Sequence, residues 1–178
     1  MSTDAIVMLR DDHKRLRRLI RDYRSADGGP SAPPGTRRTA ADPRAEAQAV
    51  EEFLHLLTVH TFLDEEVVYP RVRRLAPDTQ ETLLELHEEH HVADVLAREL
   101  SGMDAGDEAY GAKTRVLMAA VERHMEMEED GWFPQVRRAV GRKELQAVGA
   151  RMAEVREQAP RQPHRPLLDK VVDAFAAT

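Results

Sequence analysis

A pattern of histidine, acid, aromatic residue and proline occurs twice in the sequence. The first copy, HTFLDEEVVYP, spans residues 60–70, and the second, HMEMEEDGWFP, spans residues 124–134. Each copy carries a carboxylate four residues after its histidine, namely Asp64 and Glu128. Residues four apart in a helix point in nearly the same direction, about 40° apart. Each copy therefore offers one nitrogen and one oxygen ligand from one helix face, and two such helices facing each other would form a metal site.

Histidines also occupy the middle of the apolar stripe in each of four expected helices: His13, His60, His90 and His124. A single histidine of this kind is usually structural, and a single acid can be an exposed charge. The combination of four inward histidines with two matched acids predicts a metal site, because buried acids are costly unless they are paired or bound to a cation. Imidazole and carboxylate without sulfur suit iron, manganese or zinc. The absence of cysteine excludes thiolate sites, iron–sulfur clusters and disulfides.

Apolar residues at alternating spacings of three and four predict helices over residues 4–24, 45–75, 79–101, 108–140 and 142–158. Asp4 is expected to cap the first helix, and Gly141 to end the fourth. The Gly- and Pro-rich residues 25–44 are expected to form a loop. Pro70 is expected to kink its helix or to start a new turn.

The sequence thus predicts an all-α fold, a four-helix bundle with a short additional C-terminal helix. Residues 1–158 would form the bundle and residues 159–178 a tail. The composition agrees, since 42% of the 178 residues are hydrophobic, 33% are charged and only 4% are aromatic. A net charge of −6 disfavours a general nucleic-acid surface. We find no apolar run typical of a signal peptide or membrane span, so a cytoplasmic location is expected.

Several neighbours of the repeated pattern have expected roles outside the site. Glu65 and Glu66 should point away from their histidine into solvent. Tyr69 and Phe133 lie half a turn from their histidines and should pack against other helices. His55 is expected at the surface or in an interhelical hydrogen bond.

The chain resembles the hemerythrin HHE cation-binding family, particularly its bacterial branch, over residues 4–140. The segments that carry the resemblance are DAIVMLRDDHKRL, EEVVYP, EEHHVADVLAREL and HMEMEEDGWFPQVRR. The resemblance implies a hemerythrin-like antiparallel four-helix bundle around two non-haem iron ions, joined by an oxo or hydroxo bridge and two carboxylates. Manganese or zinc ranks behind iron. The implied bridging pair is Asp64 and Glu128, and the implied nitrogen ligands are His13, His60, His87, His90 and His124.

Two positions depart from the family pattern. The first bridging carboxylate is usually glutamate, whereas Asp64 is one methylene shorter, so its ability to bridge both metals is open. The third helix of typical members carries two histidines four apart, which would select His87 and His91. The helical stripe and the downstream residues instead favour His90 first and His87 second, with His91 outside the site.

The resemblance implies a protein that binds or decomposes small oxidants such as O2, peroxide or NO. A peroxide-decomposing, catalase-like activity is compatible with the site but is not implied by any further motif. The alternative is a metal- or oxygen-responsive regulatory or iron-handling module without turnover, whose C-terminal tail contacts a protein partner. The remaining alternative is a metal-free structural bundle.

Overall fold

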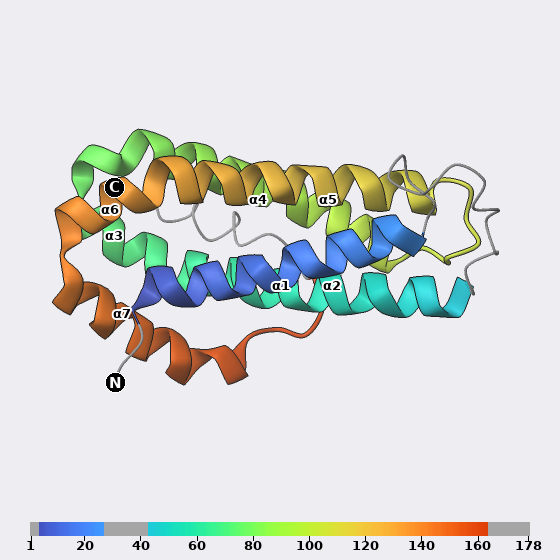
Figure 1. The fold of residues 1–178 in the computed structure, drawn as a ribbon, viewed down its shortest axis with the longest axis horizontal. Helices are drawn as coiled ribbons and strands as arrows, with labels where there is room; N and C mark the ends of the chain where they lie inside the picture. Colours follow the sequence, from blue (N-terminus) through green and yellow to red (C-terminus); the bar gives the residue numbers. More distant parts are fainter. Residues whose placement is uncertain (1–3, 27–42, 164–178) are drawn as a thin grey trace, which may run out of the picture.

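The computed structural model describes residues 4–26 and 43–163, and every regular element in these ranges is a helix. The predicted all-α class is therefore confirmed. Four long helices run side by side along the molecule (Figure 1): α1 Ala5–Ala26, α2 Pro43–Leu63, α4 Gln80–Ser101 and α5 Tyr110–Glu126. Residues 27–42, most of the predicted loop, and residues 164–178, most of the predicted tail, lie outside the described residues.

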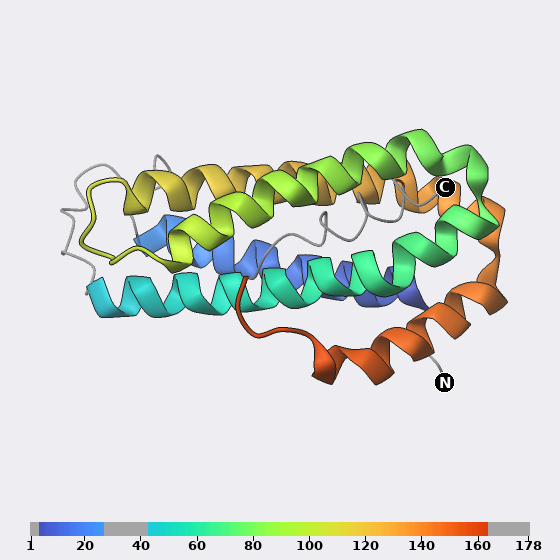
Figure 2. The same ribbon diagram turned by 180° about the vertical axis from the view of Figure 1, so that it is seen from behind.

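The four long helices form an antiparallel bundle. α1 packs on α2 and α4 packs on α5, while α2 also contacts α4 and α1 also contacts α5. Each helix thus has two neighbours and turns one face to the interior, as Figures 1 and 2 show from opposite sides. The side chain of Asp4 accepts a hydrogen bond from the amide of Val7 at 3.0 Å, which confirms the predicted cap of α1.

Both copies of the repeated pattern contain a turn of π-helix before the proline: η1 Asp64–Val68 and η3 Met127–Trp132. In each, the amide of the residue after the π turn donates to the carbonyl of the acid five residues earlier, from Tyr69 to Asp64 and from Phe133 to Glu128. Proline inside a helix removes a donor and crowds the carbonyl four residues back, and a widened turn is one way to accommodate both effects.

A short α-helix follows each π turn, α3 Tyr69–Leu75 and α6 Phe133–Val140, with the proline in its first turn. The prediction of a new turn at Pro70 is confirmed. The continuous helices predicted over 45–75 and 108–140 are each divided into an α, a π and an α segment. Hydrophobic periodicity does not distinguish these segments, because the apolar side chains stay inward throughout.

Two apolar clusters fill the bundle, one at the α3 and α6 end and one at the opposite end. Along α1, His13 lies between Leu9 of the first cluster and Leu16 of the second. The same order recurs along α4, where Leu86 and Ala93 flank its central histidine. The inward histidines therefore occupy a polar layer that is covered by apolar side chains on both sides, which keeps bulk water away from it.

A shorter helix, α7 Arg142–Val155, packs against α1, α6 and η1, and continues as a turn of 3-10 helix, η4 Arg156–Gln158. A second 3-10 turn, η2 Pro77–Thr79, leads into α4. In Figures 1 and 2, α7 lies along the α1 and α2 side of the bundle. No helix among the described residues has the length and apolarity needed to cross a membrane.

Gly141 makes the reversal between α6 and α7 possible. Its φ of 77° and ψ of 160° belong to a backbone region that is essentially restricted to glycine. The prediction that Gly141 ends its helix is confirmed.

We expect Gly141→Ala to lower the free energy of unfolding by about 1–3 kcal/mol through backbone strain alone, because an added Cβ meets no atom within 4 Å.

Urea unfolding followed by circular dichroism measures this effect. Gly106→Ala is the matched control, since Gly106 also has open space around it but no positive φ. Equal stability of the two variants would contradict the assignment of strain to Gly141.

Candidate metal centre

The four central imidazoles form two close pairs. Nε2 of His13 lies 3.3 Å from Nε2 of His60, which joins α1 to α2. Nε2 of His90 lies 2.9 Å from Nε2 of His124, which joins α4 to α5. All four residues are at most 5% exposed. The bundle thus gathers four nitrogen donors into two pairs within its polar layer.

Each of the two buried acids links one imidazole pair to the other. Oδ2 of Asp64 lies 3.3 Å from Nε2 of His60 and 4.0 Å from Nε2 of His90. This acid thus reaches both pairs in spite of its short side chain.

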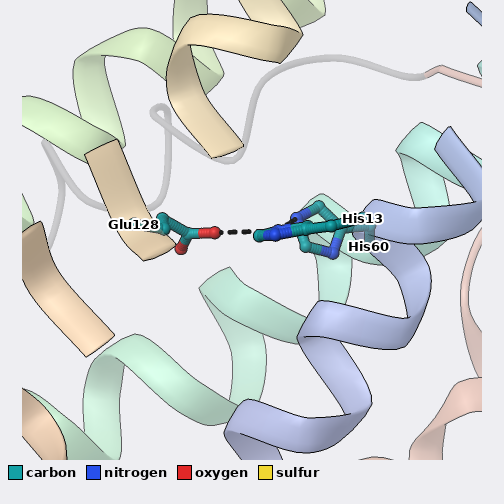
Figure 3. Close-up of side chains that lie close together, drawn as sticks. All are labelled: His13, His60 and Glu128. Carbon is teal, nitrogen blue, oxygen red and sulfur yellow. Dashed lines mark hydrogen bonds and ion pairs between the residues drawn. The ribbon is translucent and has the colours of Figure 1, made fainter. Parts of the chain in front are cut away.

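Glu128 completes the arrangement on the other side. Its Oε2 lies 3.1 Å from Nε2 of His13 and 3.7 Å from Nε2 of His124. Figure 3 shows Glu128 pointing at His13, with His60 beside it, and one donor atom from each of these three residues lies within 4.8 Å of the others. The six groups form a closed ring in which two carboxyl groups span two nitrogen pairs, and three of its residues, His13, His60 and Glu128, are close enough to hold a metal ion together.

The outer nitrogens of three of the four imidazoles each contact a second carboxylate. Nδ1 of three of the histidines donates to a carboxylate oxygen: His13 to Glu129 at 2.7 Å, His90 to Glu65 at 2.8 Å and His124 to Glu89 at 3.1 Å. An imidazole that donates from Nδ1 in its neutral form presents the lone pair of Nε2 on its other side. These hydrogen bonds therefore aim three lone pairs at the centre, as metal-ligating histidines require.

Cationic or hydrogen-bonding partners hold these outer carboxylates in place. Arg17 donates to Glu129 at 2.8 Å, and Arg123 pairs with Glu89 at 2.8 Å. His87 donates to Glu65 at 2.9 Å. The pKa of Glu65 is about 2, since the hydrogen bonds from His87 and His90 outweigh the opposing effect of its burial. The outer carboxylates are thus fixed as anions before any ion binds.

Several polar atoms of the ring have no hydrogen-bond partner. Both carboxylate oxygens of Asp64 and Oε2 of Glu128 are buried without a hydrogen-bond partner. Burial, followed by the negative charge of Glu128, raises the pKa of Asp64 well above its ordinary value. Burial and the neighbouring imidazoles, His13 first, lower the pKa of His60. Imidazole nitrogens and carboxyl oxygens that converge in an apolar interior, some of them without partners, fit a bound cation.

The ring contains six of the seven predicted ligands, and His87 is the exception. Its Nδ1 contacts Glu65, its Nε2 is buried without a partner, and no contact among the described residues joins it to the central carboxylates. A ligand role for His87 therefore stays a prediction. His91 is half-buried and also makes no such contact among the described residues.

The prediction that Glu65 points into solvent is wrong. Its side chain is 13% exposed and contacts both His87 and His90. The π turn that begins at Asp64 holds more residues than an α turn, so the next side chain is rotated toward α4. Glu66 is exposed, as predicted. The only sequence signal for these roles is that Glu65 and Glu129 occupy the same position in the two repeated patterns.

Tyr69 and Phe133 pack against other helices, as expected, but the surfaces they meet are the ring itself. The hydroxyl of Tyr69 donates to Oε1 of Glu128 at 3.1 Å, and its ring stacks on His90 with centroids 5.4 Å apart. Phe133 stacks on His13 at 5.8 Å. His55 is exposed, and its Nδ1 lies 3.1 Å from the carbonyl oxygen of Arg161, as expected for a residue outside the site.

Comparison with known proteins identifies the family. The model of the hemerythrin HHE cation-binding domain matches residues 4–136, which include the whole ring. The chain belongs to this family. A crystal structure of a hemerythrin HHE cation-binding domain-containing protein from Mycobacterium kansasii is similar with a TM-score of 0.66 and 19% identity, over 88% of this chain and 86% of that one. No curated protein matched the chain.

Membership in the HHE family makes this chain a hemerythrin-like, metal-binding helical bundle. The likeness to the M. kansasii structure supports the fold, which includes α7 beyond the matched domain. The division into a bundle of residues 1–158 and a tail of residues 159–178 stays a prediction.

The outer carboxylates should tune metal affinity. We expect Glu129→Gln to weaken metal binding about 10–100-fold, because an amide orients His13 less firmly and leaves Nε2 a poorer donor. Competition with a chelator at fixed pH measures the affinity. Glu126→Gln is the matched control, since Glu126 lies on the same helix but is exposed. Equal affinities would show that Glu129 does not support the site.

Asp94, near Glu65, gives a pH-dependent prediction. Burial and the charge of Glu65 raise the pKa of Asp94 to about 6, against 3.8 for a free side chain. The carboxyl group of Asp94 therefore binds its proton more tightly in the folded than in the unfolded state. The free energy of unfolding consequently falls as the pH rises from about 4 to about 6. Asp94→Asn should therefore be more stable than the parent by about 1–2 kcal/mol at pH 7.5 and no more stable near pH 4.

Urea unfolding of the metal-free protein at both pH values measures this difference. Asp22→Asn is the control, because Asp22 is exposed on α1. A stability difference that is independent of pH would contradict the assignment to Asp94.

Proposed function

We propose that the ring holds two non-haem iron ions and that the protein binds or decomposes small oxidants such as O2, peroxide or NO. The observation that carries this proposal is the arrangement of two carboxylates across two imidazole pairs. Imidazole and carboxylate donors suit iron, and the family model supports a bound cation. When bound, a pair of irons would supply the redox chemistry that no side chain of this protein provides.

The residues of the ring have distinct roles in this proposal. His13 and His60 would hold one ion, and His90 and His124 the other. Asp64 and Glu128 would span the two ions and offset their charge. Such a ring suits cations because, among the described residues, neither acid is paired with a lysine or arginine.

The surroundings of the ring favour small ligands. The donors are at most 5% exposed, and the two apolar clusters cover them from both ends. Burial of this degree admits diatomic or similarly small molecules and excludes a bulky organic substrate. Tyr69 donates a hydrogen bond at Glu128 and so places a proton at the edge of the ring. The same hydroxyl fixes the orientation of this carboxylate.

The metal content and optical spectrum test this function directly. We expect about two irons per chain after iron loading, and a near-ultraviolet charge-transfer absorption that changes on addition of peroxide. Iron should also raise the melting temperature, because metal at 1,000 times its dissociation constant adds about 4 kcal/mol of stability. Elemental analysis, absorption spectra and thermal unfolding provide the three measurements.

Two histidine variants serve as a matched comparison. His60→Ala should lose the absorption band and most of the iron, because it removes one donor of a pair. His91→Ala should retain both, since His91 makes no contact with the ring among the described residues. A protein that takes up no iron under these conditions, or that holds iron equally well as His60→Ala, would refute the proposal.

A further inference from the structure

The four imidazoles of the ring differ in how their outer nitrogens are held. Nδ1 of His13, His90 and His124 donates to a carboxylate within 3.1 Å. Nδ1 of His60 is buried without a hydrogen-bond partner, and the nearest carboxylate oxygen, Oδ2 of Asp12, lies 4.0 Å away. Three of the four ring imidazoles therefore have a carboxylate hydrogen-bonded to Nδ1, and His60 does not.

Arg156 explains why Asp12 does not reach His60. Its guanidinium donates to both oxygens of Asp12, at 3.1 Å to Oδ1 and 2.6 Å to Oδ2. Asp12 is almost completely buried, with its side chain 3% exposed, whereas that of Arg156 is 28% exposed. A paired guanidinium and carboxylate of this geometry is among the stronger side-chain interactions. Arg156 thus competes with His60 for the same carboxylate, and it comes from the additional C-terminal segment η4.

The exposed side of Arg156 lies in a groove of about 840 Å³ between α1, α2 and the segment that follows α7. Its ionisable lining is mainly basic: Arg15, Arg18, His55, Arg156 and Arg161, with the acids Glu52 and Glu157. Among the described residues, no carboxylate forms an ion pair with Arg18 or Arg161. The groove therefore holds guanidinium groups with hydrogen-bonding capacity left over. Guanidinium groups match the oxygens of phosphate and similar oxyanions.

We propose that this groove binds a multivalent oxyanion such as an organic phosphate, and that the bound anion draws Arg156 away from Asp12. Asp12 is then released to accept a hydrogen bond from Nδ1 of His60. Arg156 of the groove contacts Asp12, and Asp12 is the carboxylate next to His60 of the ring. The coupling half of this inference rests on the proposed metal centre, whereas anion binding in the groove does not.

A hydrogen bond from His60 to Asp12 makes Nε2 of His60 a stronger donor toward the ring. The anion therefore tightens the hold on metal, by about tenfold if Asp12 acts as other carboxylates behind metal-ligating histidines do. Thermodynamic linkage requires the converse, that bound metal tightens anion binding by the same factor. Arg156 is then a positioning residue whose partner changes with occupancy of the groove.

The binding half is tested on the full-length, metal-free protein. Calorimetric titration with sulfate, and separately with glycerol phosphate, is carried out at constant ionic strength with chloride as the balancing anion. We expect saturable binding that weakens at least tenfold in an Arg18→Gln, Arg161→Gln double variant. The matched control is Arg138→Gln, an exposed arginine on α6 outside the groove. Absence of saturable binding, or equal loss in the control, overturns the proposal whether or not the protein binds iron.

The coupling half is tested on the iron-loaded protein by chelator competition and by the charge-transfer spectrum. Sulfate should raise the iron affinity of the parent about tenfold and shift its absorption band. Arg156→Gln should show the tighter hold without sulfate and no further response. Asp12→Asn should hold iron no more tightly than the sulfate-free parent and should lack the sulfate response. An unchanged sulfate response in both variants overturns the coupling.

A variant that keeps the positive charge tests the coupling even if Arg156→Gln fails to fold. Arg156→Lys keeps the positive charge beside Asp12 but lacks the paired hydrogen bonds. We expect it to fold, to hold iron more tightly than the parent and to respond to sulfate less. Parent-like iron affinity and sulfate response in Arg156→Lys overturn the proposal. The iron content of the unsubstituted protein tests the di-iron assignment separately. If that protein holds iron but the variants behave as the parent does, only the coupling fails.

Discussion

The placement of two carboxyl groups and four imidazoles in an apolar interior governs the rest of this structure. Lone pairs and negative oxygens repel one another at this density, and apolar side chains above and below the ring prevent water from compensating them. The burial that would destabilise a protein without bound cations creates affinity for them. Part of the folding free energy of this bundle is therefore available as metal-binding free energy, as in other proteins whose ligands converge only in the folded state.

The two π turns show how a repeated sequence pattern becomes a nearly symmetric site. Each turn starts at or beside a ring carboxylate and is followed directly by the residue before a proline. The amide of that residue, Tyr69 or Phe133, bonds the carbonyl of the ring acid, so the aromatic side chain is held close to the ring. Each π turn thus has three effects. It positions the ring acid, turns the following glutamate toward a histidine and places an aromatic side chain against an imidazole. Its occurrence in both halves gives the ring its pairwise construction.

The outer carboxylates connect the buried ring to the surface of the bundle. Arg17, Arg123 and His87 each hold a carboxylate that orients a histidine of a different helix. These chains of contacts keep the imidazole tautomers fixed, which neither the apolar packing nor the ring itself would do. At Asp12 the chain runs instead to Arg156 beyond the four-helix bundle, so the C-terminal helix is connected to the ring through polar contacts as well as through packing.

The sequence by itself indicated the helical segments, the inward stripe and the six ring residues, although it placed His87 with them. These features depend on spacing along a single helix, and a period of 3.6 residues is a property of the local chain. Helical spacing could not show that Glu65 and Glu129 face histidines, because both lie in π turns that change the angular position of each residue. It also gave no reason to pair Asp12 with Arg156, which are 144 residues apart. Only tertiary packing decided which nitrogens face one another, that Asp64 reaches both pairs, and that His87 contacts Glu65 and not the ring. Each of these depends on distances between helices, for which the order of residues along the chain carries no direct signal.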